Sequence, residues 1–183
     1  MQNRGFMAIK PFEKKLPKDS LLILGAGGLG QAVAEIAKIS GNFARYAFLD
    51  DKMDGDPVLD ALDYLNKYKA DFTHCIAAFG SNSLRAFYTA KIKELGFQLP
   101  VIIHPSAVIS AMAQVAPGTI IREKVALSHG VTVEEGCLLN MGCLIDHNCH
   151  IGAFSHIPMG AIVRNGAHIL PQSNFKPQEV IEK

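Results

Sequence analysis

Residues 101–175, divided into sixes, read VIIHPS AVISAM AQVAPG TIIREK VALSHG VTVEEG CLLNMG CLIDHN CHIGAF SHIPMG AIVRNG AHILPQ SNF. The third residue of each block is aliphatic, or phenylalanine in the last, and the first residue is small or β-branched. A helix repeats near 3.6 residues and a plain strand near 2, so neither explains a period of six. Hexapeptide units each form a short strand and a turn, and three make one triangular coil of about eighteen residues. The stretch therefore predicts a parallel β-helix, which we expect to be left-handed.

The cysteines follow the same register. Cys137, Cys143 and Cys149 take the small inward position on three consecutive sides of one coil, and Cys75 lies in an apolar run. Free cysteine behaves as a small buried hydrophobe, so we expect core residues here and neither a disulfide framework nor a zinc site.

Composition excludes several classes of protein. With 183 residues, 49% of them hydrophobic and 19% charged, the chain can bury a core and has room for two small domains. A net charge of +1 gives no electrostatic reason to expect nucleic acid or an anionic membrane as a partner. The apolar runs are too short for membrane insertion, and the N-terminus lacks the apolar region of a signal peptide, so we expect a cytoplasmic protein.

Strands and helices alternate before the repeat. We expect a buried strand at 21–24, a helix near 31–39, a strand at 45–49, a helix over 58–68, a strand at 74–79 and a helix over 84–95 ending at Gly96. This order predicts a small parallel α/β sheet with helices on its faces, a Rossmann-like half-domain. We assign 1–19 to an N-terminal extension, 20–99 to the α/β domain, 100–175 to the β-helix and 176–183 to a C-terminal tail.

A glycine loop follows the first strand. Gly25-x-Gly27-x-x-Gly30 opens a helix, where backbone N–H groups and the positive helix end favour an anion. Asp50 ends the second strand, where a carboxylate can accept a hydrogen bond from a ribose hydroxyl. About eighty residues form only one mononucleotide-binding half, so we expect a nucleotide or nucleotide sugar and not NAD. The alternative is a glycine turn that only packs the helix on the strand.

Histidines recur on the outer side of the repeat. His129 and His147 are eighteen residues apart, so they stack on adjacent coils, and Asn165 continues their column. His147 stands between Asp146 and Asn148, which can set its tautomer. His150 and His168 stack on one side, and His156 lies on the next. Each is alternatively an ordinary surface histidine.

These motifs together resemble a known family. They are the loop at 23–28, Phe48-Leu49-Asp50-Asp51, Gly80-Ser81-Asn82-x-x-Arg85, Ile103-His104-Pro105-Ser106-Ala107 and the segment from Asp146 to His156. Residues 20–170 look like the sugar O-acyltransferases related to sialic acid O-acetyltransferase and to the UDP-amino-sugar N-acetyltransferases of the bacillosamine pathway. The resemblance implies a nucleotide-sugar domain, a left-handed β-helix, a homotrimer, and acetyl-CoA bound between neighbouring helices as a co-substrate without a tightly bound cofactor.

The resemblance also implies roles for individual residues. His147 matches the general base, oriented by Asp146 or Asn148. His156 matches a second histidine near the acyl donor, and Asn165-Gly166 lies where a backbone N–H is expected to hold the thioester carbonyl. The residues that would bind a UDP- or CMP-linked sugar are Gly25, Gly27, Gly28, Gly30, Asp50, Asp51, Ser81, Asn82 and Arg85. The sequence departs from the family at Leu29, where many members have histidine, and at Asn148, where an acidic residue is common.

The expected activity is acetyl transfer to an amine or hydroxyl of a nucleotide-linked sugar, with His147 as the base. Outward apolar residues predict a trimer interface: Ile120, Leu138, Met141, Leu144 and Ile162. Two alternatives remain open. One is a non-catalytic nucleotide-sugar-binding trimer, because the family continues for further coils where this chain leaves the repeat at Pro171-Gln172. The other is a metalloenzyme of the γ-carbonic-anhydrase kind, which His129 and His147 would suit.

Overall fold

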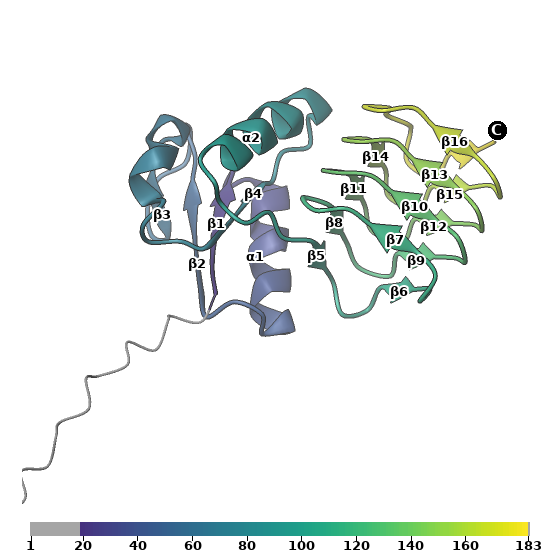
Figure 1. The fold of residues 1–183 in the computed structure, drawn as a ribbon, viewed down its shortest axis with the longest axis horizontal. Helices are drawn as coiled ribbons and strands as arrows, with labels where there is room; N and C mark the ends of the chain where they lie inside the picture. The colour runs from purple at the N-terminus through teal and green to yellow at the C-terminus, as the bar shows by residue number, and fades with distance from the viewer. Residues whose placement is uncertain (1–18, 183) are drawn as a thin grey trace, which may run out of the picture.

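A computed structural model describes residues 19–182 and shows an α/β part followed by a stack of short strands (Figure 1). The expected extension 1–19 therefore lies, apart from Asp19, outside the described residues. The fold agrees with the predicted class. An N-terminal parallel α/β sheet precedes a three-sided β-helix.

The α/β part is built on a four-stranded parallel sheet of order β3-β2-β1-β4. Its strands are β1 (Ser20–Leu24), β2 (Arg45–Leu49), β3 (Val58–Asp60) and β4 (His74–Ala77). All five residues of β1 are buried, because helices cover both faces of the sheet. The helices are α1 (Gly28–Ser40), the 3-10 helix η1 (Leu62–Tyr68) and α2 (Asn82–Glu94).

One predicted helix is wrong over its first turn. We expected a helix across 58–68, but Val58–Asp60 forms strand β3, and only Leu62–Tyr68 is helical. Val58 pairs in parallel with Phe48, and the N–H of Asp50 donates to the carbonyl of Asp60 at 3.0 Å. Pairing with the exposed edge of β2 therefore outweighs the local helical pattern, as is common for β-branched residues.

The repeat folds as the period of six predicts. Each unit contributes a two-residue strand, and residues eighteen apart pair in parallel, so the strands stack into three sheets. The first sheet contains β5 (Ile102–Ile103), β8 (Ile120–Ile121), β11 (Leu138–Leu139) and β14 (His156–Ile157). The second contains β7 (Gln114–Val115), β10 (Thr132–Val133), β13 (His150–Ile151) and β16 (His168–Ile169). The third contains β6 (Val108–Ile109), β9 (Ala126–Leu127), β12 (Leu144–Ile145), β15 (Ile162–Val163) and β17 (Val180–Ile181).

The interior of the coil confirms the predicted inward positions. Cys137, Cys143 and Cys149 are buried in one apolar cluster with the aliphatic residues of the repeat. Burial raises the pKa of the Cys137 thiol to about 11, so this thiol stays protonated and apolar at neutral pH. On the outside, the rings of His150 and His168 stack as predicted, with centroids 4.6 Å apart and planes 7° apart.

The β-helix continues for one more strand beyond residue 175, where we expected it to end. We placed 176–183 in a tail, but β17 pairs with β15, with Val180 opposite Ile162 and Ile181 opposite Val163. Gln178 makes the preceding turn in the left-handed region, at φ 61°, where most turns of this coil have glycine. Other units also lack that glycine, but this is the first in which the small or β-branched inward position is replaced by a charged residue, Glu179, which conceals the unit in the sequence.

The two parts pack through α1 and the first sheet of the coil (Figure 1). Ile120 and Leu138, which point outward from the coil, are buried in one cluster with Val33 and Ile36 of α1. Both were expected at a subunit interface, and that assignment is wrong. Their apolar surface is covered within the chain.

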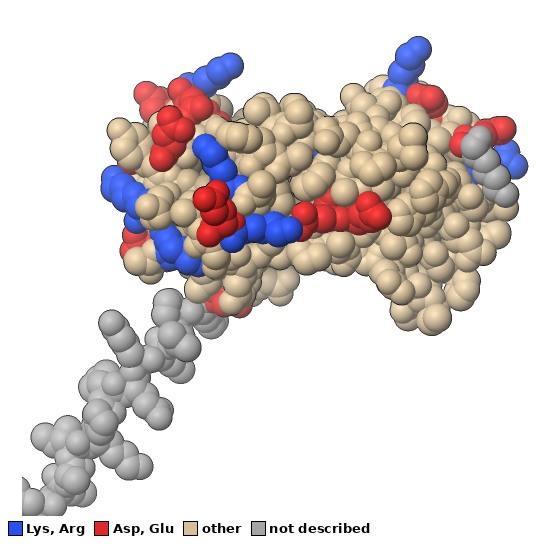
Figure 2. Space-filling view, turned by 45° about the horizontal axis from the view of Figure 1, so that its top comes forward, with Lys and Arg blue, Asp and Glu red and all other residues tan. Residues whose placement is uncertain are grey.

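Charge is distributed without a dominant sign. On the face shown in Figure 2, basic and acidic side chains are interspersed over the α/β part, and fewer lie over the coil. No helix within residues 19–182 combines the length and apolarity needed to cross a bilayer.

Candidate functional site

A pocket of about 390 Å³ lies at the carboxyl edge of the α/β sheet, where β1, β2 and β4 end. This edge is where open α/β sheets bind ligands. The pocket contains most of the residues expected to bind a nucleotide, together with an apolar wall. Its lining is Gly25, Gly27, Gly28, Leu29, Asp50, Asp51, Lys52, Leu62, Ala78, Phe79, Gly80, Leu84 and Tyr88.

The glycines of the loop have two different roles. A Cβ on Gly30 would lie 1.9 Å from the carbonyl oxygen of Gly25, so Gly30 allows α1 to pack against the loop and does not line the pocket. Gly27 and Gly28 are exposed, and a Cβ on either would meet no atom within 4 Å. The fold therefore does not require glycine at these two positions, whereas a ligand approaching the backbone would.

Asp50 holds the loop in place. Its Oδ2 accepts from the N–H of Ala26 at 2.7 Å, and its Oδ1 accepts from Lys52 at 2.8 Å and Met53 at 3.0 Å. Burial alone would raise the pKa of this carboxyl, but the three backbone donors lower it below its usual range. Sequence reasoning gave Asp50 only a ligand role. Its neighbour Asp51 also lines the pocket and accepts from the N–H of Leu62 at 2.9 Å.

The predicted substrate residues Ser81, Asn82 and Arg85 do not line the pocket. Ser81 caps α2 by accepting from the N–H of Leu84 at 3.3 Å. Arg85 is 1% exposed and its guanidinium donates to backbone carbonyls of both parts of the chain. A buried and fully engaged guanidinium cannot contact a substrate, so the predicted role for Arg85 is corrected.

His147 lies exposed at a corner of the coil. Its backbone N–H donates to Asp146 Oδ1 at 2.7 Å, so Asp146 fixes the main chain of the turn. The side chain that reaches the ring is Asn148, whose Nδ2 lies 3.3 Å from His147 Nδ1. Asn148 adopts φ 56° and completes the turn in the left-handed region. Of the two predicted orienting residues, the structure therefore places Asn148 against the imidazole.

The predicted column on this corner is present. The N–H of Asn148 donates to the carbonyl of His129, and the N–H of Gly166 donates to the carbonyl of His147, each at 2.9 Å. Successive coils are thus joined through the column of His129, His147 and Asn165. The N–H of Gly166 is already used by this ladder, and a backbone N–H near Asn165-Gly166 as the donor to the thioester carbonyl stays a prediction.

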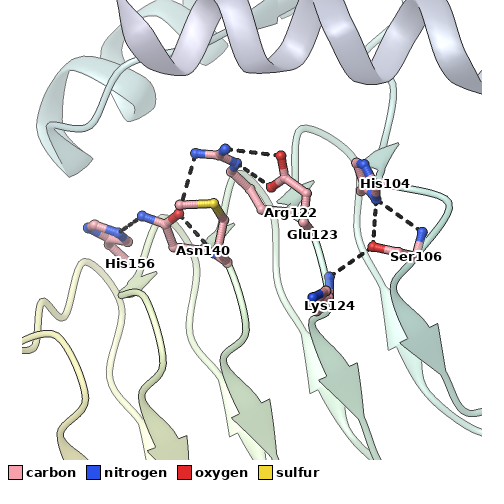
Figure 3. Close-up of polar contacts among 8 residues, drawn as sticks. His104, Ser106, Arg122, Glu123, Lys124, Asn140 and His156 are labelled. Atoms are coloured by element: carbon pink, nitrogen blue, oxygen red, sulfur yellow. Dashed lines mark hydrogen bonds and ion pairs between the residues drawn. The ribbon is translucent and has the colours of Figure 1, made fainter.

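His156 lies half-buried on β14, on a different side of the coil from His147. Its Nε2 is 3.4 Å from Asn140 Nδ2 (Figure 3). Burial lowers the pKa of this imidazole, and the nearby Arg85 cation lowers it further, against a hydrogen bond that the protonated ring donates to the Asn174 side chain, which raises it. Within one chain, His147 and His156 therefore belong to separate surfaces.

Sequence reasoning missed a polar row on the side of the coil that faces α1 (Figure 3). Arg122 Nε pairs with Glu123 Oε2 at 2.9 Å, and Arg122 Nη1 lies 3.5 Å from Asn140 Oδ1. Asn140 then reaches His156. A signal for this row existed in the sequence, because Arg122 and Asn140 are eighteen residues apart at the turn position after the inward aliphatic residue.

Metal-binding residues are not gathered in the described part of the chain. Across 19–182, no group of three or more histidine, cysteine, aspartate or glutamate side chains is placed to hold a metal ion.

Known proteins share this architecture. The PglD N-terminal domain family matches residues 20–92. The acetyltransferase domain of PglB from Neisseria gonorrhoeae is 31% identical, with a TM-score of 0.77, over 87% of this chain and 83% of that one. The same domain in complex with acetyl coenzyme A is 29% identical with a TM-score of 0.78, over 91% of this chain and 92% of that one. PerB from Caulobacter crescentus, in complex with CoA and GDP-perosamine, is 26% identical with a TM-score of 0.70, over 85% of this chain and 82% of that one.

No curated protein sequence matches the chain significantly. The identity to the PglB domain, over most of both chains, and the PglD match to the α/β part agree with the paired sheet and coil described above. The chain belongs to the hexapeptide-type sugar acetyltransferases.

Proposed function

We propose that this protein transfers an acetyl group from acetyl-CoA to the amino group of a nucleotide-linked sugar. One observation supports this proposal: a single chain of this family contains both a pocket large enough for a nucleotide and a coil with an exposed histidine, His147, at its corner. Related structures contain the expected ligands: acetyl coenzyme A in the PglB domain, and CoA with GDP-perosamine in PerB. An amine acceptor is favoured over a hydroxyl because GDP-perosamine N-acetyltransferase is among the structural relatives.

The acceptor nucleotide would lie in the pocket at the sheet edge. Gly27 and Gly28 leave the first turn of α1 open to a diphosphate, which the helix N-terminus favours. Asp50 already accepts three backbone hydrogen bonds, so we assign the ribose hydroxyls to Asp51. Among the contacts of residues 19–182, Asp51 accepts one hydrogen bond, from Leu62. The apolar wall of Leu62, Leu84 and Tyr88 suits a nucleobase.

His147 would act as the general base. Its Nε2 takes a proton from the amine as the nitrogen attacks the thioester carbonyl, a C–N bond forms, the C–S bond breaks, and CoA leaves as a thiolate that receives a proton. A neutral imidazole with a free Nε2 lone pair carries its proton on Nδ1, and Nδ1–H requires an acceptor. The Asn148 amide supplies one when its oxygen occupies the position 3.3 Å from Nδ1, since the oxygen and nitrogen of an amide are interchangeable by rotation.

Asn148→Asp tests this assignment. A carboxylate beside Nδ1 stabilises the imidazolium form of the ring, and aspartate tolerates the left-handed φ of 56° at this position. We expect the acidic limb of the pH–rate profile to move upward by roughly one pH unit, with activity retained above it. Asn148→Ala should lower the rate, because it removes the contact to the ring. A profile unchanged in both variants would show that Asn148 does not orient the base.

We also propose that the protein is a homotrimer that packs through the third sheet of the coil. The outward residues of this sheet are all apolar: Val108, Ala126, Leu144, Ile162 and Val180. Leu144 is 45% exposed and Ile162 39%, and they line a groove of about 450 Å³ that reaches Asp146, next to His147. A contiguous apolar face of this kind usually marks an interface. A second copy here would bring its own coil beside His147, which the chain's own His156 does not reach.

Leu144→Glu tests the interface. A carboxylate buried at the centre of this face without a partner strongly opposes association, so the trimer should dissociate at micromolar concentration in sedimentation velocity, and acetyl transfer should fall with it. Gln114→Glu is the matched control, because Gln114 points outward from β7 on a different face. A wild-type protein that sediments as a stable monomer contradicts this part of the proposal.

A further inference from the structure

The guanidinium of Arg85, in the first turn of α2, lies between the two parts of the chain. Its Nη1 donates to the carbonyls of Phe79 at 2.9 Å and Gly80 at 3.0 Å, within the α/β part. Its Nε donates to Gly136 at 3.1 Å and its Nη2 to Phe154 at 2.8 Å, both in turns of the coil. One rigid planar group therefore makes hydrogen bonds to both parts.

The carbonyls on either side belong to functional segments. Phe79 and Gly80 form one wall of the nucleotide pocket. On the other side, Arg85 Nη2 also reaches the carbonyl of Ser155 at 3.4 Å, and Ser155 directly precedes His156. The same side chain thus contacts the wall of the acceptor pocket and the turn that carries the second histidine.

Asn82 extends this connection to the next coil. Its Oδ1 accepts from Arg85 Nη2 at 2.8 Å, and its Nδ2 donates to the carbonyls of Gln172 at 2.9 Å and Ser173 at 3.0 Å. The carbonyl of Ser173 also accepts from the N–H of His156 at 2.9 Å. The N-terminus of α2 therefore holds the coil turns on both sides of His156.

We propose that Arg85 is a positioning residue that fixes the nucleotide pocket relative to the turn bearing His156. Its effect on rate rests on the proposed function, because only a two-substrate reaction needs the pocket and the coil in one defined geometry. Displacing reacting groups by about 1 Å can cost on the order of 100-fold in rate.

Arginine is the side chain that can perform this task. It offers five N–H donors in a fixed plane, whereas lysine offers three on a flexible stem. Burial lowers the pKa of Arg85 to about 10, so the group remains a cation at neutral pH. That cation is also one of the causes that hold the pKa of His156 below its usual range. Arg85 thus influences His156 through both geometry and charge.

Two substitutions separate these effects. Arg85→Lys keeps the positive charge and loses the planar fork, so kcat/KM should fall roughly 10- to 100-fold while the pKa of His156 stays low. Arg85→Met loses both the charge and the planar fork, so kcat/KM should fall at least as much as in Arg85→Lys, and the pKa of His156 should rise. Lys93→Met is the matched control, because Lys93 lies on the same helix and its side chain makes an exposed ion pair to Glu135 of the coil, at 2.8 Å. We expect that control to keep the wild-type rate.

Two readouts do not depend on turnover. The first is the pKa of His156, measured by NMR titration of its ring. The second is the distance between spin labels on Phe87→Cys in α2 and Met159→Cys in the coil, both exposed sites, and labelling is selective because the four native cysteines are buried. The distance distribution should broaden in Arg85→Lys and stay narrow in Lys93→Met.

The rate and the distance distribution of the Arg85→Lys protein decide whether Arg85 positions the two parts. An Arg85→Lys protein with the wild-type rate and the wild-type distance distribution overturns the inference. If Arg85→Met does not fold, Arg85→Lys alone decides by these two measurements. A wild type that neither binds UDP, CDP or GDP nor acetylates any sugar would defeat the proposed function instead, and the distance and titration measurements would still test Arg85.

Discussion

His147→Ala is expected to lower kcat at least 100-fold, which corresponds to about 2.7 kcal/mol of transition-state stabilisation. The ring lies exposed at the corner of the coil beside Asn148, so its loss removes a base and leaves the packing intact. Nucleotide affinity should stay within about twofold, because the pocket is formed by other elements. The free energy of unfolding should change by less than about 0.5 kcal/mol. Steady-state kinetics, nucleotide titration and thermal unfolding measure the three quantities.

His129→Ala is the matched control for that experiment. His129 occupies the same column on the adjacent coil, and it is similarly exposed. If any imidazole at this corner could serve, the two variants would lose the same amount of activity. If His147 alone is the base, kcat falls in the His147→Ala protein and not in the His129→Ala protein. Full activity in the His147→Ala protein would contradict the proposed mechanism.

Gly27→Val should weaken nucleotide binding at least 100-fold. Because a Cβ at this position would meet no protein atom within 4 Å, the added side chain fits the unliganded fold and occupies only the space above the helix N-terminus. A phosphate approaching the N–H groups of the first turn would be blocked. Calorimetry with UDP, CDP and GDP measures the loss, and an unchanged thermal transition shows that the fold is intact.

Gly30→Ala provides the contrasting result. Its Cβ would lie 1.9 Å from the carbonyl oxygen of Gly25, so α1 must move away from the loop and the free energy of unfolding should fall by roughly 1–3 kcal/mol. The two variants thus distinguish a glycine required by a ligand from one required by packing. Nucleotide affinity that survives Gly27→Val would mean that the loop is only a packing turn.

The fold could be predicted because its strongest signals are periodic. In the coil, every inward residue returns after six positions and every neighbouring strand after eighteen, so both the strands and their pairing can be read from the sequence. The exceptions are places where the residue types depart from the expected pattern. Glu179 stands at the small inward position of the last unit, and Val58 joins an edge strand within a helix-like pattern.

The candidate site could be predicted only in part, for a different reason. The glycine loop, Asp51 and His147 carry side-chain or backbone chemistry that a sequence motif exposes. The partners of Arg85 are backbone carbonyls at Phe79, Gly136 and Phe154, and a carbonyl has no signature in the sequence. The motif that contains Arg85 was therefore assigned to the substrate, although its side chain joins the two parts of the chain.

The most direct test of the proposed function is a product assay on the wild-type protein. Acetyl-CoA is incubated with UDP-, CMP- and GDP-linked amino sugars, and mass spectrometry follows the addition of one acetyl group while a thiol reagent follows released CoA. We predict an acetylated sugar formed in equal amount to free CoA, with at least a 100-fold loss in the His147→Ala protein. Tight binding of a nucleotide sugar with no acetylated product from any of these acceptors would contradict the account and favour a non-catalytic binding protein.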